Sequence, residues 1–303
     1  MKNKKVNSLK LAVSVLMFAV MAIVVSSCKS NEDTFSAEDV ATSSNESTAE
    51  SQTSETDDIA SGVLNSNDAA PGRVEAGVDD IRIPASCATI TKVNNDGDKK
   101  SGVITIDFGA GCTDAAKNTR KGKMIISWNG GKWFLPGSTH KITFSGYSIN
   151  DVKFSDSDSR TVTNVSTTSS PLTWTVTSNH SLTYPDGTTT SRSVNLTKKW
   201  NRTATITADT WTFSQTTGAS VAAEGTNKKG KSYKMTITTP LVYSRSCALS
   251  NKVFLPISGS KTITVNSKDI VFEYGTGTCD NTFTVTVNGK TKEITAKNDG
   301  SGD

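Results

Sequence analysis

The chain has 303 residues, of which 34% are hydrophobic and 20% charged, and its formal net charge is +4. This length allows one large or two small globular domains. The small net charge combines unlike regions: residues 29–80 hold thirteen acidic side chains against two basic ones, whereas residues 81–303 hold twenty-seven basic against sixteen acidic. The basic residues are scattered and form no helical stripe, so we expect no nucleic-acid partner.

Residues 1–27 have the pattern of a secretory signal. Four lysines lie within the first ten residues, an apolar run extends from Leu11 to Val25, and two serines lead to Cys28. A basic start, a short apolar core and small residues at the cleavage point are typical of a signal peptide, and the run is short for a membrane span. Ser26-Ser27-Cys28 resembles the bacterial lipobox. This resemblance implies that Cys28 is acylated, with palmitate among the acyl chains, and anchors the mature protein in a membrane.

Residues 28–80 are expected to form a disordered acidic tether behind the lipidated cysteine. They are rich in Ser, Thr, Glu, Asp and Ala and nearly free of aromatic residues. Such a segment buries too little apolar surface to offset the entropy lost on ordering. Its start, Cys28 to Asp33, resembles the export signal of lipoproteins of the Bacteroidetes, which implies an outer-membrane protein displayed on the cell surface. The periplasmic face of that membrane is the alternative.

From Ile81 the polarity pattern changes to a period of two, in which apolar side chains alternate with Thr, Ser or Lys. Segments 174–176, 194–196, 235–237, 263–265 and 283–287 show this alternation, which is typical of strands with one buried face. Turn signals separate them, at 129–131, 185–187 and 288–289. We therefore predict one all-β domain over 81–303, with about fifteen short antiparallel strands in a sandwich or flattened barrel.

One motif occurs twice in this domain. Residues 104–114 and 270–280 each run from an apolar strand through acid-aromatic-Gly-x-Gly to a cysteine and an aspartate, and each is preceded by another cysteine. Four cysteines in an exported protein indicate two disulfides, for which three pairings exist. The repeat favours Cys87–Cys112 and Cys247–Cys279; crossed pairs or free thiols stay open. The cysteines and the two histidines lack metal-ligand spacing, so we expect no metal site.

Two alternative functions depend on particular side chains of this domain. Trp128 and Trp133 flank a predicted hairpin tip, where an exposed aromatic pair could stack on sugar rings; burial of both in the core is the competing interpretation. Asp107 and Glu273 occupy matching places in the repeat and could serve as the two carboxylates of a glycoside hydrolase. The competing interpretation is that such acids cap turns or pair with nearby bases. The glycine pairs of the repeat lack a dinucleotide fingerprint, so we expect no cofactor.

Segments 87–91, 102–109, 120–123 and 280–289 are similar to a group of Bacteroidetes cell-envelope lipoproteins, and the similarity covers most of residues 85–296. It implies an all-β fold and a location in the envelope, and it implies no activity. The leading hypothesis is a surface-displayed outer-membrane lipoprotein that is not an enzyme and that binds a glycan or an envelope protein, or serves structurally. A carbohydrate-binding accessory lipoprotein and a carboxylate-dependent glycoside hydrolase are the alternatives. The sequence leaves the oligomeric state open.

Overall fold

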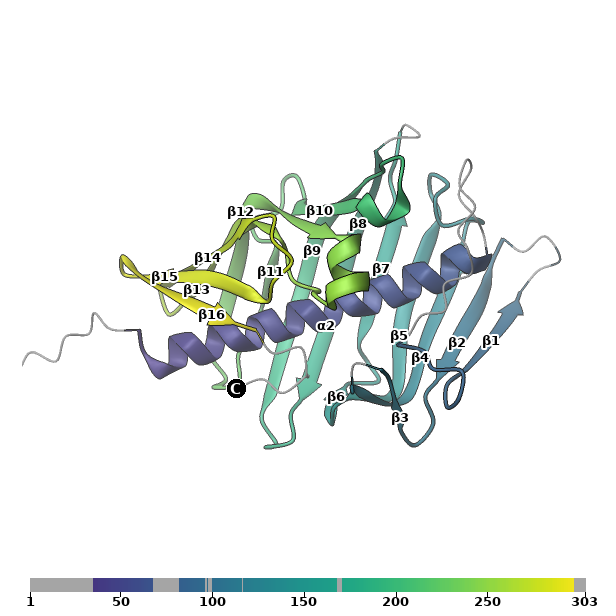
Figure 1. The fold of residues 1–303 in the computed structure, drawn as a ribbon, viewed down its shortest axis with the longest axis horizontal. Helices are drawn as coiled ribbons and strands as arrows, with labels where there is room; N and C mark the ends of the chain where they lie inside the picture. Colours follow the sequence, from purple (N-terminus) through teal and green to yellow (C-terminus); the bar gives the residue numbers. More distant parts are fainter. Residues whose placement is uncertain are drawn as a thin grey trace, which may run out of the picture. The chain divides into compact units, whose positions relative to one another are not determined.

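The computed structural model describes residues 35–67, 82–95, 97, 100–115, 117–167 and 171–296. The chain divides into two compact units, and the second, Ser36–Asp303, contains every element discussed below. Within the described residues it consists of one antiparallel sheet and one long α-helix, α2 (Ala37–Asn67), which lies across the strands (Figure 1). Two short helical turns, η1 (Ile206–Ala208) and η2 (Cys247–Asn251), lie in the connections.

The sheet contains sixteen strands among the described residues, and their lengths range from two to thirteen residues. In chain order they are β1 (Thr89–Asn94), β2 (Gly102–Asp107), β3 (Cys112–Thr113), β4 (Thr119–Asn129), β5 (Thr139–Ile149), β6 (Val152–Phe154), β7 (Ser159–Asn164), β8 (Leu172–Thr183), β9 (Thr189–Asn201), β10 (Thr210–Gln215), β11 (Ala223–Thr226), β12 (Ser232–Ser244), β13 (Ser258–Val265), β14 (Lys268–Thr276), β15 (Thr282–Val287) and β16 (Lys290–Thr295).

All strand pairs are antiparallel, which confirms the predicted all-β class. The order is β1-β2-β4-β5-β6-β8-β9-β10-β12-β13-β14-β15-β16, with β3, β7 and β11 attached beside this path. The strands therefore form one open sheet that does not close, so the flattened barrel, one of the two predicted arrangements, is wrong. Side chains alternate between an inner face, which packs on α2, and an outer face, as the burial pattern along β8 and β9 shows. Threonine occupies many outer positions, where its branched Cβ favours extended backbone.

Helix α2 lies inside the segment that we expected to be a disordered tether, so that expectation is wrong for residues 37–67. The helix begins with a reciprocal cap: the Ser36 amide donates to Asp39 Oδ2 over 2.9 Å, and the Asp39 amide donates to Ser36 Oγ over 3.1 Å. Ser47 and Thr56 donate their hydroxyls to carbonyls one turn earlier, at 3.0 and 2.8 Å. The tertiary contacts of this polar helix, described below, supply the stabilisation that its composition does not.

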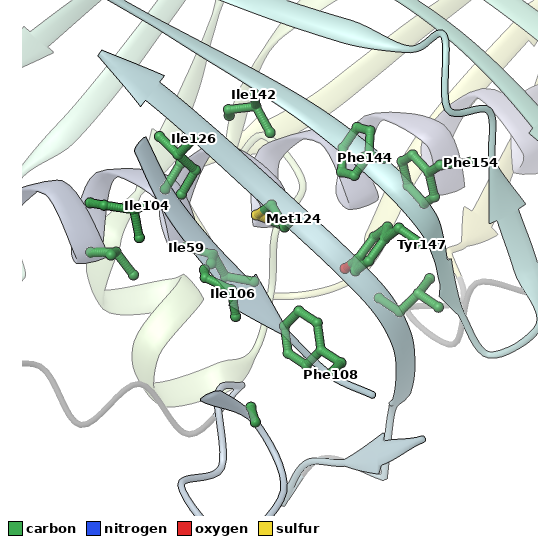
Figure 2. Packing of buried hydrophobic residues seen from close by; sticks show 14 of the residues in the cluster. Ile59, Ile104, Ile106, Phe108, Met124, Ile126, Ile142, Phe144, Tyr147 and Phe154 are labelled. Carbon is green, nitrogen blue, oxygen red and sulfur yellow. The ribbon is translucent and has the colours of Figure 1, made fainter. Parts of the chain in front are cut away.

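The apolar contact between α2 and the sheet is concentrated in the C-terminal part of the helix, although Ala49 also packs against it. Ile59, Ala60, Val63 and Leu64 are buried there. They belong to a cluster with inner-face side chains of β2, β4, β5 and β6 that include Ile104, Ile106, Met124, Ile126, Phe144, Tyr147 and Phe154 (Figure 2). Burial of one such side chain contributes about 1.5–3 kcal/mol, so this cluster anchors that end of the helix.

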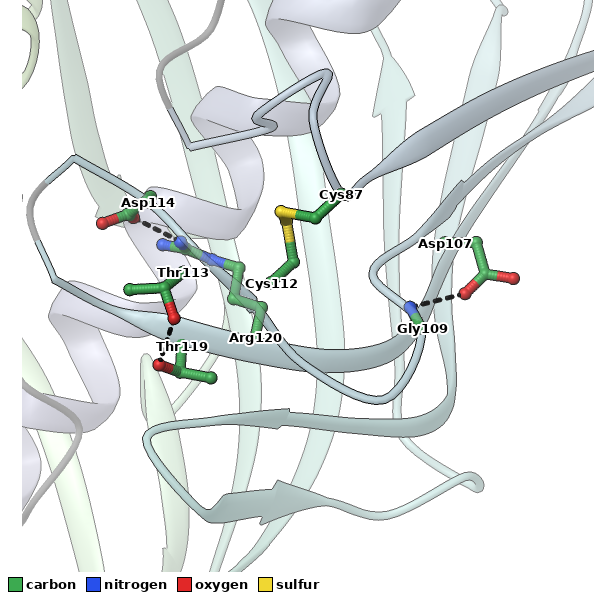
Figure 3. Close-up of a disulfide and its surroundings, with 8 residues drawn as sticks. All are labelled: Cys87, Asp107, Gly109, Cys112, Thr113, Asp114, Thr119 and Arg120. Atoms are coloured by element: carbon green, nitrogen blue, oxygen red, sulfur yellow. Dashed lines mark hydrogen bonds and ion pairs between the residues drawn. A yellow bond between two sulfur atoms is a disulfide. The ribbon is translucent and has the colours of Figure 1, made fainter.

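Both predicted disulfides are confirmed. Cys87 and Cys112 have Cα atoms 5.4 Å apart (Figure 3), and Cys247 and Cys279 have Cα atoms 5.2 Å apart. Each joins a residue that precedes a two-stranded hairpin, β1–β2 or β13–β14, to a residue that comes after it: Cys112 opens β3, and Cys279 lies in the loop between β14 and β15. The sequence repeat is therefore a repeated hairpin with the same covalent crosslink.

Candidate functional site

The two tryptophans predicted as an exposed sugar platform lie in the interior instead. Trp128 is only 7% exposed. Trp133 is half-buried, and its ring centroid lies 5.6 Å from that of Trp174 and 5.4 Å from that of Trp200. The loop after β4 packs onto the inner face, and Ser138 Oγ donates to the Trp133 carbonyl at 2.9 Å. The expectation that both rings are exposed at a hairpin tip is wrong, because Trp128 is buried and Trp133 stacks on other large rings.

The two carboxylates of the hydrolase alternative lie on distant strands. Asp107 is on β2, the second strand of the order, and Glu273 is on β14, the eleventh. Asp107 Oδ1 accepts a hydrogen bond of 2.8 Å from the Gly109 amide, and its other oxygen lies 3.1 Å from Lys123 Nζ (Figure 3 shows the first contact). These two contacts lower the pKa of Asp107. Asp107 therefore caps a turn and pairs with a base.

The other two repeat acids also have structural partners. Asp114 accepts a hydrogen bond of 3.0 Å from the Asn118 amide and forms an ion pair with Arg120, 2.5 Å from oxygen to nitrogen. Asp280 accepts hydrogen bonds from the backbone and the hydroxyl of Thr282, at 3.0 and 2.8 Å. The interpretation of these acids as turn caps and ion-pair partners is thus confirmed.

The densest group of charges lies between α2 and the inner face of the sheet. Acidic side chains of the helix meet basic side chains from five strands, and nearly all of these groups are buried. The pairs are Asp39–Lys268, Glu46–Arg192, Glu46–Lys261, Glu50–Lys261, Glu55–Arg120, Asp57–Arg160 and Asp57–Lys198. We call this layer the inner charge layer. It holds the part of α2 that carries little apolar surface.

Glu50 is the centre of the N-terminal half of this layer. One carboxylate oxygen lies 2.6 Å from Lys261 Nζ and accepts a hydrogen bond of 2.7 Å from Tyr274, and the other accepts one of 2.8 Å from Tyr243. Burial raises the pKa of Glu50, but the charges of Lys261 and Arg192 together with these hydrogen bonds lower it overall. Burial and the neighbouring Glu50 charge raise the pKa of both tyrosines well above the usual value. Glu50 is therefore ionised at neutral pH and the phenols keep their protons.

Asp57 is the corresponding centre farther along the helix. Its Oδ2 accepts a hydrogen bond of 2.6 Å from Arg160, and Lys198 Nζ lies 3.8 Å from the same oxygen. Burial opposes the charge of Asp57, yet Arg160 and Lys198 lower its pKa overall. Burial lowers the pKa of the nearby His140 to about 4, so this imidazole is neutral above that pH. Chemically, the arrangement is an electrostatic clamp of fixed opposite charges.

A small cavity of about 30 Å³ lies beside the helix within this layer. Asn45, Gln52, His180 and Arg192 are among the residues that line it. Burial lowers the pKa of His180 to about 3, and neither ring nitrogen has a hydrogen-bond partner within the described part of the chain. The cavity has room for one or two water molecules.

A larger hollow, of about 470 Å³, lies on the outer face over β13–β15. The strand register places Ser260, Glu273, Thr284 and Glu293 in one row across β13, β14, β15 and β16. All four line the hollow, together with Asp280. Carboxylates and hydroxyls thus dominate its polar groups. The sequence indicated Glu273 only as a possible partner of Asp107 and Asp280 only as a repeat acid, and it did not connect them with Ser260, Thr284 or Glu293.

The inner charge layer was not predicted from the sequence, although the positions of the basic residues in the strands indicate it. Arg160, Arg192, Lys198 and Lys261 stand in phase with buried apolar residues of their strands, such as Val194. A basic side chain at a buried strand position requires a buried acidic partner. The regular spacing of acids along residues 39–57 supplies it.

Comparison of the chain with protein-family models, with curated proteins and with solved structures found no match. No helix among the described residues is both long and apolar enough to cross a membrane. Cys28 lies outside the described residues.

Proposed function

We propose that this protein is a lipid-anchored protein of the outer membrane, displayed on the cell surface, which acts through non-catalytic contacts. Two observations and one general rule support the proposal. Ser26-Ser27-Cys28 comes after a signal-like segment, the remaining four cysteines are paired as disulfides, and disulfides form in compartments outside the cytoplasm. The similarity to envelope lipoproteins of the Bacteroidetes agrees with this location.

The observation that carries the proposal is the position of α2 directly behind the anchor residue. The helix α2 begins nine residues after Cys28. The inner charge layer and the apolar cluster hold it against the inner face of the sheet. Nine residues span at most about 30 Å when fully extended. An acyl chain on Cys28 therefore anchors a rigid body close to the membrane, and most of the long tether expected from the sequence is absent.

In this proposal the partner binds the outer face of the sheet, because α2 covers the inner face. The hollow over β13–β15, of about 470 Å³, lies on that face, and Glu273 and Glu293 line it. Hydroxyls and carboxylates are groups that hydrogen-bond polar partners. We favour an envelope protein as the partner. A glycan is the second candidate, and the hollow now supports it in place of the buried tryptophans.

Intact-mass analysis of the protein from its own membranes tests the anchor. We expect a mature chain that begins at Cys28 and carries acyl chains, and a Cys28→Ser variant that leaves the membrane fraction. Protease treatment of whole cells should cleave the displayed domain. An unmodified residue 28 would overturn the proposal.

Binding is tested with a glycan array and with crosslinking on cells. Glu273→Gln with Glu293→Gln should reduce the captured partner, whereas the same exchange at Glu224, on β11, should not. Turnover of a captured glycan by the purified protein would contradict the non-catalytic role.

A further inference from the structure

The helix α2 begins at one particular end of the sheet. Lys268 Nζ lies 2.6 Å from Asp39 in the first turn of the helix, and Asn227 donates to the Thr42 hydroxyl over 3.2 Å. Lys268 opens β14, and Asn227 stands in the turn between β11 and β12. The first turns of α2 are therefore fixed to the ends of these strands.

Three turns lie together at this end, as the strand register shows. Tyr233 pairs with Val265, which places the β11–β12 turn, 227–231, beside the β13–β14 turn, 266–267. The pairing of Val271 with Thr286 places the β15–β16 turn, 288–289, next in line. The start of α2 thus emerges among three neighbouring turns.

Lysines predominate on these turns and on the adjoining strand ends. Exposed or half-buried lysines stand at 228, 229, 231, 234, 290 and 292, and we call this surface the lysine end. The acids in the same region are Glu38, Asp186, Glu224, Asp269 and Glu293, besides Asp39, which pairs with Lys268. Two of these acids are engaged locally: Asp186 accepts from Thr188 and Asp269 from Thr264, at 2.6 and 2.7 Å. From residue 225 to residue 268 the sequence contains no acidic residue.

We propose that the lysine end faces the membrane and binds the phosphates of anionic lipid headgroups. This inference rests on the proposed anchor at Cys28. An anchor nine residues before α2 keeps the start of the helix, and hence the three turns, within about 30 Å of the acyl chains. A lysine near an anionic membrane surface favours association by roughly fivefold in the partition coefficient. The anchor supplies attachment, and the lysine end sets the orientation of the sheet.

The opposite end of the sheet provides a matched control. Lys132 lies in the β4–β5 connection, Lys141 is the third residue of β5 and Lys199 lies near the end of β9. All three are exposed, as are Lys229, Lys231 and Lys290 at the lysine end. Exchange of either triple to Gln removes the same charge from the surface.

The first experiment measures the surface without the anchor. The mature chain with Cys28→Ser is sedimented with vesicles of two parts phosphatidylcholine and one part phosphatidylglycerol, and with pure phosphatidylcholine vesicles. We expect partition only onto the anionic vesicles, weaker at higher salt. Gln at positions 229, 231 and 290 should lower the partition coefficient by roughly tenfold or more, and Gln at 132, 141 and 199 by less than about twofold. Equal losses for both triples would overturn the inference, as would retention on an acidic polysaccharide without partition onto vesicles.

The second experiment measures orientation with the anchor. The acylated protein is inserted into the same anionic vesicles, and the acetylation rate of each lysine is followed by mass spectrometry. Lys229, Lys231 and Lys290 should react several-fold more slowly than in detergent, whereas Lys132, Lys141 and Lys199 should not change. Uniform rates would overturn the inference and leave the anchor intact. An unacylated residue 28 would instead remove the anchor, and the first experiment would still test the surface.

Discussion

Lys261 on β13 contacts Glu50 on α2, with 2.6 Å between Nζ and Oε2, although the two residues are 211 positions apart in the chain. The lysine side chain is fully buried. The pair links the first helix of the described chain to one of its last strands, so it reports directly on whether α2 is docked.

Replacement of Lys261 by Met should lower the free energy of unfolding by roughly 3–5 kcal/mol, because it leaves the buried Glu50 carboxylate without its closest counter-charge. The double variant Lys261→Met/Glu50→Gln should recover part of this loss, since no buried charge then lacks its partner. Urea denaturation followed by circular dichroism measures both. Lys199→Met, on the outer face, is the control and should change the free energy by no more than about 0.5 kcal/mol. A double variant less stable than the single one would contradict the clamp.

The stability of the fold should decrease as the pH falls from 6.5 to about 4. Burial lowers the pKa of His140 from 6.5 to about 4 and that of His180 to about 3. Between the two values the unfolded chain binds protons that the folded chain does not, and each such proton costs about 1.4 kcal/mol per pH unit. Below about pH 4.5 the loss should steepen, because the pKa of Glu50 and of Asp57 is also lower in the folded state.

Urea midpoints measured across this pH range test the sign. The variant His140→Gln/His180→Gln should lose the decrease between pH 6.5 and 4 and keep the loss below it. Between about pH 6 and 4 its stability should even rise slightly on acidification, because burial raises the pKa of Asp158 to about 6 in the folded state. The slope is the readout, since the substitution itself can shift stability at every pH. A wild-type midpoint that rises on acidification would refute the assignment.

Removal of the Cys87–Cys112 disulfide by serine substitution should destabilise the protein by about 3.5 kcal/mol according to chain entropy. The Cys247–Cys279 disulfide closes a slightly longer loop, 32 residues against 25, and should contribute a similar amount. Thermal denaturation of the two double-serine variants gives the comparison. Unequal losses of several kcal/mol would show that chain entropy is not the main effect.

Trp128→Ala should destabilise the fold by about 3–5 kcal/mol, because it empties a buried site that a large ring fills. The exposed neighbour Lys132→Ala should be nearly neutral. Chemical denaturation and intrinsic fluorescence measure the change. If Trp128→Ala kept full stability and abolished glycan capture, the ring would be a ligand platform after all.

The strands of this fold were readable from local pattern. Phe283–Val287 alternates apolar and threonine side chains and forms β15, and Asn288-Gly289 forms the turn after it, with φ positive at both residues. The disulfide pairs were predicted from a repeat that proved to be a repeated hairpin. In each case residues close in sequence determine the structure, so local rules suffice.

The helix was not readable in the same way. Residues 37–57 carry the composition of a disordered segment, and only Ile59, Val63 and Leu64 offer apolar anchors. The acidic residues of this segment are held in the helix by buried basic partners such as Arg160 and Lys261, which lie more than one hundred residues away in the chain. The composition of a segment indicates how much apolar surface it can bury. It does not indicate whether buried opposite charges elsewhere in the chain will pair with it. The absence of Gly and Pro from residue 34 to 61 was the one local sign of a helix.

The wide sequence separation of the α2 contacts has a consequence for biogenesis. Ion pairs of the helix reach strands 65 to 229 residues downstream. A chain that leaves a translocon from its amino end cannot complete these pairs until the last third has emerged. Folding therefore finishes late, as expected for a topology dominated by distant contacts. During that interval the leading segment is still unpacked. In the proposed lipoprotein, the enzymes that process Cys28 would therefore reach it before the sheet assembles around the helix.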